Sequence, residues 1–177
     1  INVNIAMHHC KEVSYLVNDK YYFAIGYKND INGYELRNKY FKGCTSKAPT
    51  TNGVGNDVCK VFEGFVDYLS YLTLKNTFYL QESSVVLNSI SNLEKAESFI
   101  TSHNTIVTYL DNDEAGRRAT SYLKSFGKNL INKSSHYQNH KDLNDYLVNK
   151  NNLKNKLTDD IDEGIKSELS NSYRRKR

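Results

Sequence analysis

The sequence has few cysteines and no long hydrophobic run. Cys10, Cys44 and Cys59 are odd in number and widely spaced, which argues against a disulfide framework and against a zinc site built from cysteine pairs. No apolar stretch approaches the roughly 18 residues that a membrane helix requires, and no charged-then-apolar signal segment stands at the start. We therefore expect reduced thiols, a cytoplasmic location and no membrane partner.

Length and charge set wide limits. The 177 residues, 38% of them hydrophobic, are enough for one compact core with a small addition. A net charge of +4 permits a polyanionic partner such as DNA but does not identify one. The segment His8–Cys10 has no second ligand pair at a suitable spacing, so we assign it no metal role. Because Ile1 rather than Met stands first, we expect the chain to be part of a longer protein.

The residue pattern divides the chain near residue 55. From Tyr21 to Tyr40, aromatic and polar residues alternate around turn formers at 29–33, which predicts a β-hairpin. Residues 43–57 hold the only proline and three glycines, a composition typical of a linker. We expect three parts: a β-rich segment (1–55), a larger domain (56–150), and a C-terminal helix with a basic tail (151–177).

Short β runs alternate with helical runs in the larger domain. The predicted strands are 58–62, 84–87, 105–110 and 129–132, and the predicted helices are 65–75, 93–102, 114–126 and 143–149. This alternation predicts an α/β fold with a mostly parallel sheet of about four strands and helices on both faces. Beyond it, apolar residues at four-residue spacing from Leu153 to Leu169 predict a helix packed on its own domain.

Acidic residues follow two of the predicted strands. Glu63 ends the first strand and is followed by Gly64, while Asp111 and Asp113 follow the third strand. Because the carboxyl ends of neighbouring parallel strands converge on one crevice, we expect these three acids to meet. Carboxylates with no Lys or Arg between them repel one another unless cations bind, and hard oxygen ligands favour Mg²⁺ or Mn²⁺.

Each acid also fits a purely structural role. Asp113 is suited to cap the third helix of the larger domain, and Asp67 the first. Asp142 and Asp145, which follow the fourth strand, are either first-turn residues of the next helix or part of the metal site. The placement of all these acids at strand-to-helix junctions favours a shared site.

The acidic segments resemble the motifs of a known domain. They are "EGFVD" (63–67), "DNDEAG" (111–116) and "KDLND" (141–145). In order and spacing they are similar to the motifs of the Toprim domain, the catalytic fold of bacterial primases, type IA and type II topoisomerases and some nucleases. The primase-like proteins of plasmids and mobile elements are the most similar branch, with "DEAGRRA" (113–119) the most specific piece. The resemblance implies a Toprim (Rossmann-like) sheet preceded by a small β-hairpin subdomain.

The resemblance also implies roles for particular residues. Glu63, Asp111 and Asp113 correspond to the catalytic, metal-binding acids, and Asp142 to a further ligand. Glu63 is either a ligand or the proton acceptor for an attacking hydroxyl. The sequence departs from the bacterial primases at Asn144, where they usually carry a second aspartate. An uncharged ligand there implies a weaker second metal site.

Basic residues near these motifs are candidates for contacting nucleic acid or nucleotides. Lys28, Arg37 and Lys39 lie on or after the hairpin, interleaved with aromatic residues. This mixture suits either a single-stranded template or an ordinary hairpin with a buried aromatic face. Arg117 either reaches an incoming triphosphate or covers the outer helix face, and Lys141 belongs to the third motif.

The function that the resemblance implies is Mg²⁺- or Mn²⁺-dependent nucleotidyl transfer. The substrates are nucleoside triphosphates, the template is single-stranded DNA, the product is an RNA primer, and a replicative helicase is a further expected partner. We expect a mobile-element or plasmid protein. The alternatives are a Toprim nuclease and a degenerate Toprim module that binds nucleic acid for mobilisation without turnover. Whether this chain is active by itself is left open.

Overall fold

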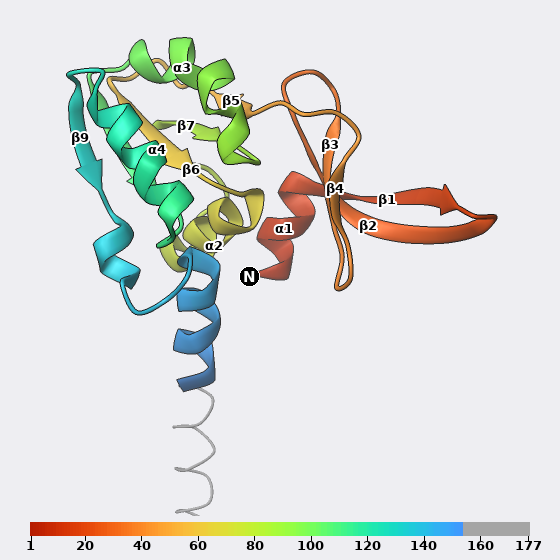
Figure 1. Ribbon diagram of the computed structural model, residues 1–177. Coiled ribbons are helices and arrows are strands. Elements are labelled where there is room, and N and C mark those ends of the chain that lie inside the picture. Colours follow the sequence, from red (N-terminus) through yellow and green to blue (C-terminus); the bar gives the residue numbers. More distant parts are fainter. Residues whose placement is uncertain (154–177) are drawn as a thin grey trace, which may run out of the picture.

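The computed structural model describes residues 1–153, which form two units lying side by side (Figure 1). The first unit, red to orange, is an antiparallel sheet with one short helix. The second, yellow to blue, is a mostly parallel sheet between helices. The apolar stripe predicted beyond Leu153 and the basic tail lie outside the described residues.

The first unit contains a four-stranded antiparallel sheet in the order β1-β2-β3-β4. Its elements are α1 (Val3–His9), β1 (Cys10–Val17), β2 (Lys20–Lys28), β3 (Tyr34–Arg37) and β4 (Lys42–Cys44). The predicted hairpin is confirmed as β2 and β3, and its turn is closed by a 2.8 Å hydrogen bond from Gly33 N to Asn29 Oδ1. The sequence interpretation missed α1 and β1.

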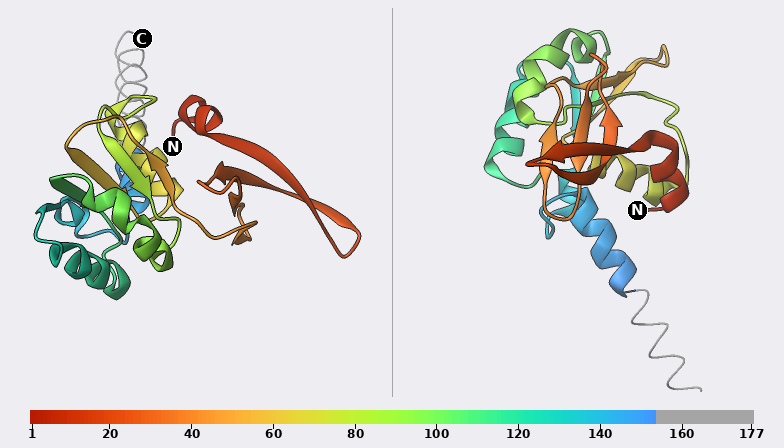
Figure 2. Two further views of the ribbon diagram at one scale, coloured as in Figure 1. Left: turned by 90° about the horizontal axis from the view of Figure 1, so that it is seen from above. Right: turned by 90° about the vertical axis from the view of Figure 1, so that its right-hand side faces the viewer.

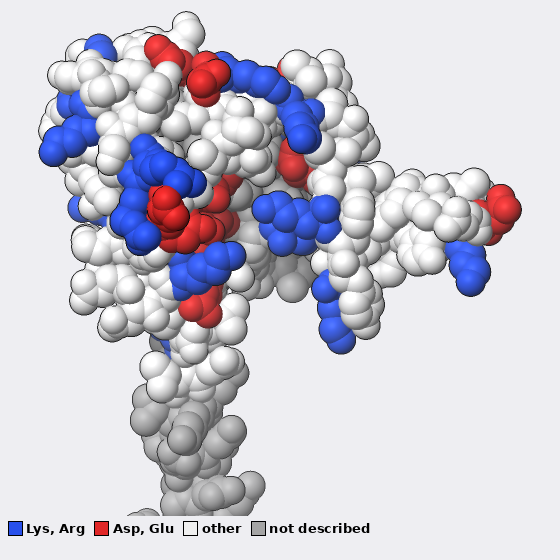
Figure 3. Space-filling view, in the orientation of Figure 1, with Lys and Arg blue, Asp and Glu red and all other residues white. Residues whose placement is uncertain are grey.

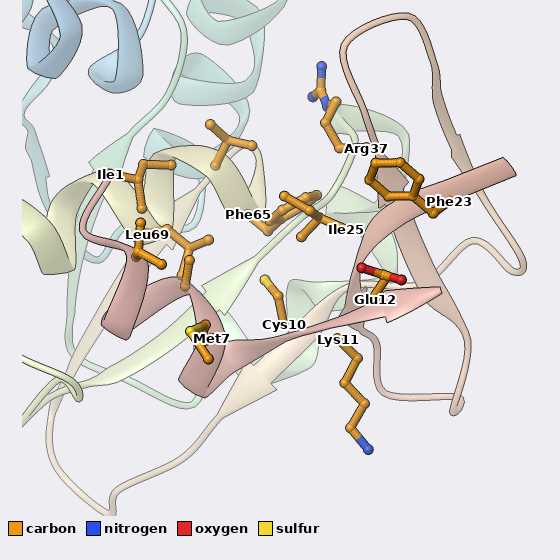
Figure 4. A pocket seen from close by; sticks show the side chains of 13 residues that line it. Ile1, Met7, Cys10, Lys11, Glu12, Phe23, Ile25, Arg37, Phe65 and Leu69 are labelled. Carbon is orange, nitrogen blue, oxygen red and sulfur yellow. The ribbon is translucent and has the colours of Figure 1, made fainter. Parts of the chain in front are cut away.

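The β1–β2 hairpin extends away from the rest of the molecule (Figure 2). Its two turn residues, Asn18 and Asp19, have φ values of 48° and 60°, a conformation that Asn and Asp tolerate better than most residues. Tyr21 is 81% exposed near this turn. At the base of the hairpin, α1, β2 and α2 enclose an apolar groove of about 360 Å³, in which Phe65 of α2 lies near Ile25 of β2 (Figure 4).

The second unit contains a five-stranded sheet in the order β5-β7-β6-β8-β9. The strands are β5 (Thr50–Asn52), β6 (Val58–Phe62), β7 (Ser83–Val86), β8 (Thr105–Tyr109) and β9 (Asn129–Asn132). All neighbours are parallel except β5, which runs antiparallel to β7. The predicted α/β fold is confirmed. The fifth strand, β5, forms within the segment expected to be a linker, because that segment lies along the free edge of β7.

Helices cover both faces of this sheet. They are α2 (Phe65–Lys75), α3 (Leu93–Thr101), α4 (Glu114–Lys124), the single turns η1 (Ile90–Asn92) and η2 (Ser134–Tyr137), and a helix over residues 143–153. Along β6, Cys59 and Val61 pack with α3 and α4, while Phe62 packs with α2. Within the described part, no helix is long and apolar enough to cross a membrane. All three cysteines lie in this part and are free.

The two units meet through α2. The ring of Tyr27 in β2 stacks on that of Phe65, with centroids 5.2 Å apart and planes inclined by 7°. Ile5 of α1 belongs to the same buried cluster, together with Tyr68 and Leu69 of α2. The first unit is therefore packed on the helix that begins immediately after the Glu63–Gly64 junction.

Candidate metal centre

Three carboxylates converge at the carboxyl edge of the parallel strands. Asp67, Asp111 and Asp142 each offer an oxygen atom, and these three atoms lie within 4.8 Å of one another. Asp67 comes from the first turn of α2, Asp111 follows β8, and Asp142 precedes the 143–153 helix. The predicted meeting of strand-end acids therefore occurs here, with a membership that differs in part from the expected one.

Asp67 is the member that the sequence interpretation missed. It was considered as a helix cap, but the N-cap of α2 is Gly64, which has no side chain to donate or accept a capping bond. The Asp67 carboxylate is 8% exposed and accepts a 3.2 Å hydrogen bond from the main-chain N–H of Asn144. Its position one helical turn after Gly64 was the available signal, because that spacing directs the side chain back over the junction.

Asp111 is held in place by close backbone packing. A Cβ atom on Gly116 would overlap the main-chain carbonyl oxygen of Asp111, so only glycine fits there without a shift of the backbone. Asn112 ties the same segment to the loop before Asp142. Its main-chain N–H donates to Lys141 O at 2.7 Å, and its side-chain amide donates to His140 O at 3.0 Å. These contacts fix the end of β8 against the third acidic segment.

Glu63 and Asp113 lie beside the three converging carboxylates but outside the group. Glu63 Oε2 accepts a 3.3 Å hydrogen bond from the main-chain N–H of Asp111. Asp113 is exposed and is the N-cap of α4, where its Oδ1 accepts a 2.9 Å hydrogen bond from Gly116 N. Glu63 therefore lies next to Asp111, whereas one carboxylate oxygen of Asp113 is engaged in capping α4.

The third acidic segment contributes Asp142 alone to the group. Asp145 Oδ2 lies 3.2 Å from His140 Nδ1 and accepts from Lys141 N at 3.3 Å, so it contacts its own loop. Asn144, considered as an uncharged ligand, accepts a 3.2 Å hydrogen bond from Ser70 Oγ through its carboxamide oxygen. Its main chain, rather than its side chain, contacts Asp67.

Burial and mutual repulsion raise the pKa values of these acids. The pKa of Asp67 is raised to about 7, first by burial and then by the charges of Asp142 and Asp111. The pKa of Glu63 is also raised to about 7, by burial and by Asp111, and that of Asp111 to about 6, by burial and by Asp142. The nearest opposing charge is Lys141, whose Nζ lies 3.9 Å from Asp111 Oδ2.

This environment fits a divalent cation. All the converging donors are carboxylate oxygens, the atoms that Mg²⁺ and Mn²⁺ prefer. The pKa values of these acids are raised first by burial and then by their mutual repulsion, and a bound cation would relieve that repulsion. Asp67, Asp111 and Asp142 are therefore the residues that would hold the cation, with Glu63 next to them.

A cleft of about 680 Å³ opens above the carboxylates, between the two units. From the first unit, Arg37 of β3 and Lys42 of β4 line the cleft together with Glu35, and Lys141 lines it from the second unit. Figure 3 shows acidic side chains gathered on this face of the second unit, with basic side chains on several sides of them. The cleft thus combines a site for a cation with positive charge suited to phosphate groups.

The other predicted basic residues lie outside the cleft. Lys28 is exposed at the end of β2, and Lys39 is exposed with its Nζ 5.3 Å from the centre of the Tyr40 ring. Arg117 is exposed on α4 and donates through a terminal nitrogen to Asn112 O at 3.3 Å. Of the aromatic residues interleaved with the basic residues of the hairpin, Tyr27 is buried in the core, as the alternative of a buried aromatic face predicts for it.

The metal-free protein is expected to lose stability as the pH rises. An acid with a raised pKa holds its proton in the folded protein at a pH where the unfolded chain has already released it. This proton binding stabilises the folded state at low pH, and the stabilisation is lost as the pH rises through the folded-state pKa. For the buried, coupled acids around Asp67, we expect the free energy of unfolding to fall by about 2–4 kcal/mol between about pH 5 and pH 8. Urea unfolding in EDTA measures this.

Asp67→Asn provides the matched variant. The amide keeps an oxygen that accepts from Asn144 N but removes the charge, so the variant should be about 1–3 kcal/mol more stable than the parent at about pH 8 without metal. Added Mn²⁺ should stabilise the parent more than the variant. An unchanged pH slope in Asp67→Asn would contradict the assignment of this repulsion to Asp67.

The comparisons with known proteins agree with this fold. Residues 60–147 match a family model described as Toprim-like, which agrees with the mostly parallel sheet described above. Residues 1–46 match a family described as a domain of unknown function (DUF8464). No curated protein matches the sequence.

Among solved structures, the chain is similar to the crystal structure of the primase fragment of bacteriophage T7 primase-helicase protein. The TM-score is 0.55 and the sequence identity 19%, and the match covers 78% of this chain. It covers 62% of that chain, which is less than two thirds of its length. At this identity the similarity establishes a shared fold.

Proposed function

We propose that this chain is the Toprim-containing part of a primase-like nucleotidyltransferase that makes RNA primers on single-stranded DNA. The observation that carries the proposal is the convergence of Asp67, Asp111 and Asp142 in a cleft that Arg37 and Lys42 of the first unit also line. The Toprim-like match and the fold shared with a phage primase fragment support it. In this proposal the protein is cytoplasmic, comes from a plasmid or other mobile element, and works with a replicative helicase.

The reaction joins an acceptor hydroxyl to the α-phosphate of a nucleoside triphosphate. The new bond forms between the hydroxyl oxygen and the α-phosphorus, the bond to the β-phosphate oxygen breaks, and pyrophosphate leaves. A bound divalent cation supplies neutralisation of the charge that develops on the phosphate oxygens. Asp67, Asp111 and Asp142 would hold that cation, and Asp113 at the rim is the further acid that the Toprim motif implies.

The remaining residues of the cleft orient substrate and move the proton. Glu63 is held beside Asp111 by a main-chain hydrogen bond, and its pKa of about 7 suits it to accept the proton of the attacking hydroxyl. Arg37, Lys42 and Lys141 border the cleft, where they attract the triphosphate and the template backbone. Lys28, Lys39 and Arg117 lie further out and extend this positive surface along the template.

Primer extension tests the function directly. The chain is mixed with Mg²⁺ or Mn²⁺, ribonucleoside triphosphates and a single-stranded DNA carrying an annealed RNA primer, so that initiation and template selection are not required. We expect template-dependent addition of ribonucleotides to the primer. Metal-dependent nicking of the DNA without addition would identify a Toprim nuclease instead. Binding with neither reaction would identify a module without turnover.

A further inference from the structure

A second cleft borders the 143–153 helix. It has a volume of about 430 Å³ and is called here the basic cleft, after its lining residues Lys75, Lys133 and Lys150; His136 also lines it. Two half-buried rings, Tyr109 and Tyr146, complete its walls, and none of its lining residues within 1–153 is an acid. It shares no described lining residue with the cleft of about 680 Å³ above the carboxylates.

The local structure explains how one helix borders both clefts. Leu143, Tyr146 and Lys150 follow the three- and four-residue spacing of a helix face and line the basic cleft. Asp142, which precedes the helix, belongs to the carboxylate group. The opposite wall is anchored by buried Tyr137, whose hydroxyl donates to Leu110 O at 2.9 Å.

The cations of the basic cleft are not neutralised within residues 1–153. In this part of the chain, Lys75, Lys133 and Lys150 have no carboxylate oxygen within 4.0 Å, whereas Lys60 is paired with Glu82 at 2.6 Å. Lys150 instead lies 5.9 Å from the centre of the Tyr146 ring. The dipole of α2 accounts for a lysine at position 75 in its last turn, but not for the other two lysines or the rings.

We infer that the basic cleft binds a nucleotide, either free or as one unit of a strand. Its volume falls within the range of about 300–1,000 Å³ typical of sites for small ligands. Lysine ammonium groups bind phosphate as point charges, and tyrosine rings offer flat apolar faces on which a base stacks. The inference does not rest on the proposed catalytic function, because the basic cleft needs no cation.

Titration with ATP in EDTA tests this inference, since chelation prevents cation-dependent binding at the carboxylates. ATP and a short single-stranded oligonucleotide are titrated separately by calorimetry at low salt. We expect Lys133→Glu/Lys150→Glu to weaken binding by about tenfold or more. The control, Lys124→Glu/Lys128→Glu, makes the same change in net charge elsewhere and should change affinity by less than about twofold.

The outcomes separate the sources of the nucleotide. Saturable ATP binding that the cleft variant weakens supports a free nucleotide, while the same result with the oligonucleotide alone supports a strand. Tyr146→Ala should also weaken whichever ligand binds, because the ring face is lost. Equal affinity in the cleft and control variants, or no binding of either ligand to the parent chain, would overturn the inference. Thermal midpoints of all variants establish that they are folded.

Discussion

Asp111→Asn is expected to reduce primer extension by on the order of 10³-fold, because it removes one of the carboxylate charges that would hold the divalent cation. The substitution preserves side-chain size and leaves the main-chain donor to Glu63 in place. Folding should therefore survive, and relief of repulsion should leave the metal-free variant as stable as the parent or more so. Extension of a labelled primer in Mn²⁺ gives the rate, and the thermal midpoint gives the stability.

A second readout separates the site from the function. Mn²⁺ should raise the thermal midpoint of the parent chain and raise that of Asp111→Asn much less. Glu94→Gln, at an exposed position on α3, is the control and should behave as the parent. If Asp111→Asn loses the Mn²⁺ effect but the parent chain never extends primers, the carboxylates bind a cation and the proposed transferase function is wrong. Full extension by Asp111→Asn would remove this residue from the centre.

Gly116→Ala is expected to lower the free energy of unfolding by about 2–3 kcal/mol, even though Ala is the better helix former by about 1 kcal/mol. The added methyl group would overlap the backbone of Asp111, and a backbone cannot rotate away as a flexible side chain can. The shift should also displace the Asp111 carboxylate from its two partners and weaken Mn²⁺ binding. Urea unfolding measures stability, and the Mn²⁺-induced change in thermal midpoint measures binding.

Gly53→Ala is the matched control for this substitution. A Cβ atom at Gly53 meets its nearest neighbour, a ring carbon of Phe99, at 3.6 Å, an ordinary contact. We expect its stability to lie within about 0.5 kcal/mol of the parent. If Gly116→Ala were equally well tolerated, the close packing of α4 on the end of β8 would not be what fixes Asp111.

The larger domain was predictable because its signals are local. The predicted bounds of β6, α2 and β9 are confirmed, since each apolar run is followed by residues that end a strand or begin a helix. The hairpin of β1 and β2 carried a two-residue turn signal at Asn18 and Asp19, which the wider aromatic pattern obscured. The strand β5 could not be predicted from its composition, because it forms only where β7 offers an unpaired edge.

The group of converging acids was predictable in outline but not in membership. The convergence of the carboxyl ends of parallel strands predicted that the acids lie at one edge of the sheet. The Toprim resemblance named Glu63, Asp111, Asp113 and Asp142. Which oxygens converge depends on contacts across long stretches of sequence, such as the hydrogen bond from Asn144 N to Asp67. The roles of these residues in binding a cation stay predictions, which the variants described above test.

The stacked pair Tyr27 and Phe65 has a mechanical consequence. Phe65 lies two residues before Asp67 in the first turn of α2, so the ring that fastens the antiparallel sheet and the carboxylate beneath the cleft share one rigid helical turn. A displacement of Tyr27 in the antiparallel sheet would therefore act on the same turn that carries Asp67. The two rings, with the buried side chains around them, thus help to set the distance between Arg37 and Lys42 on one side of the cleft and the carboxylates on the other.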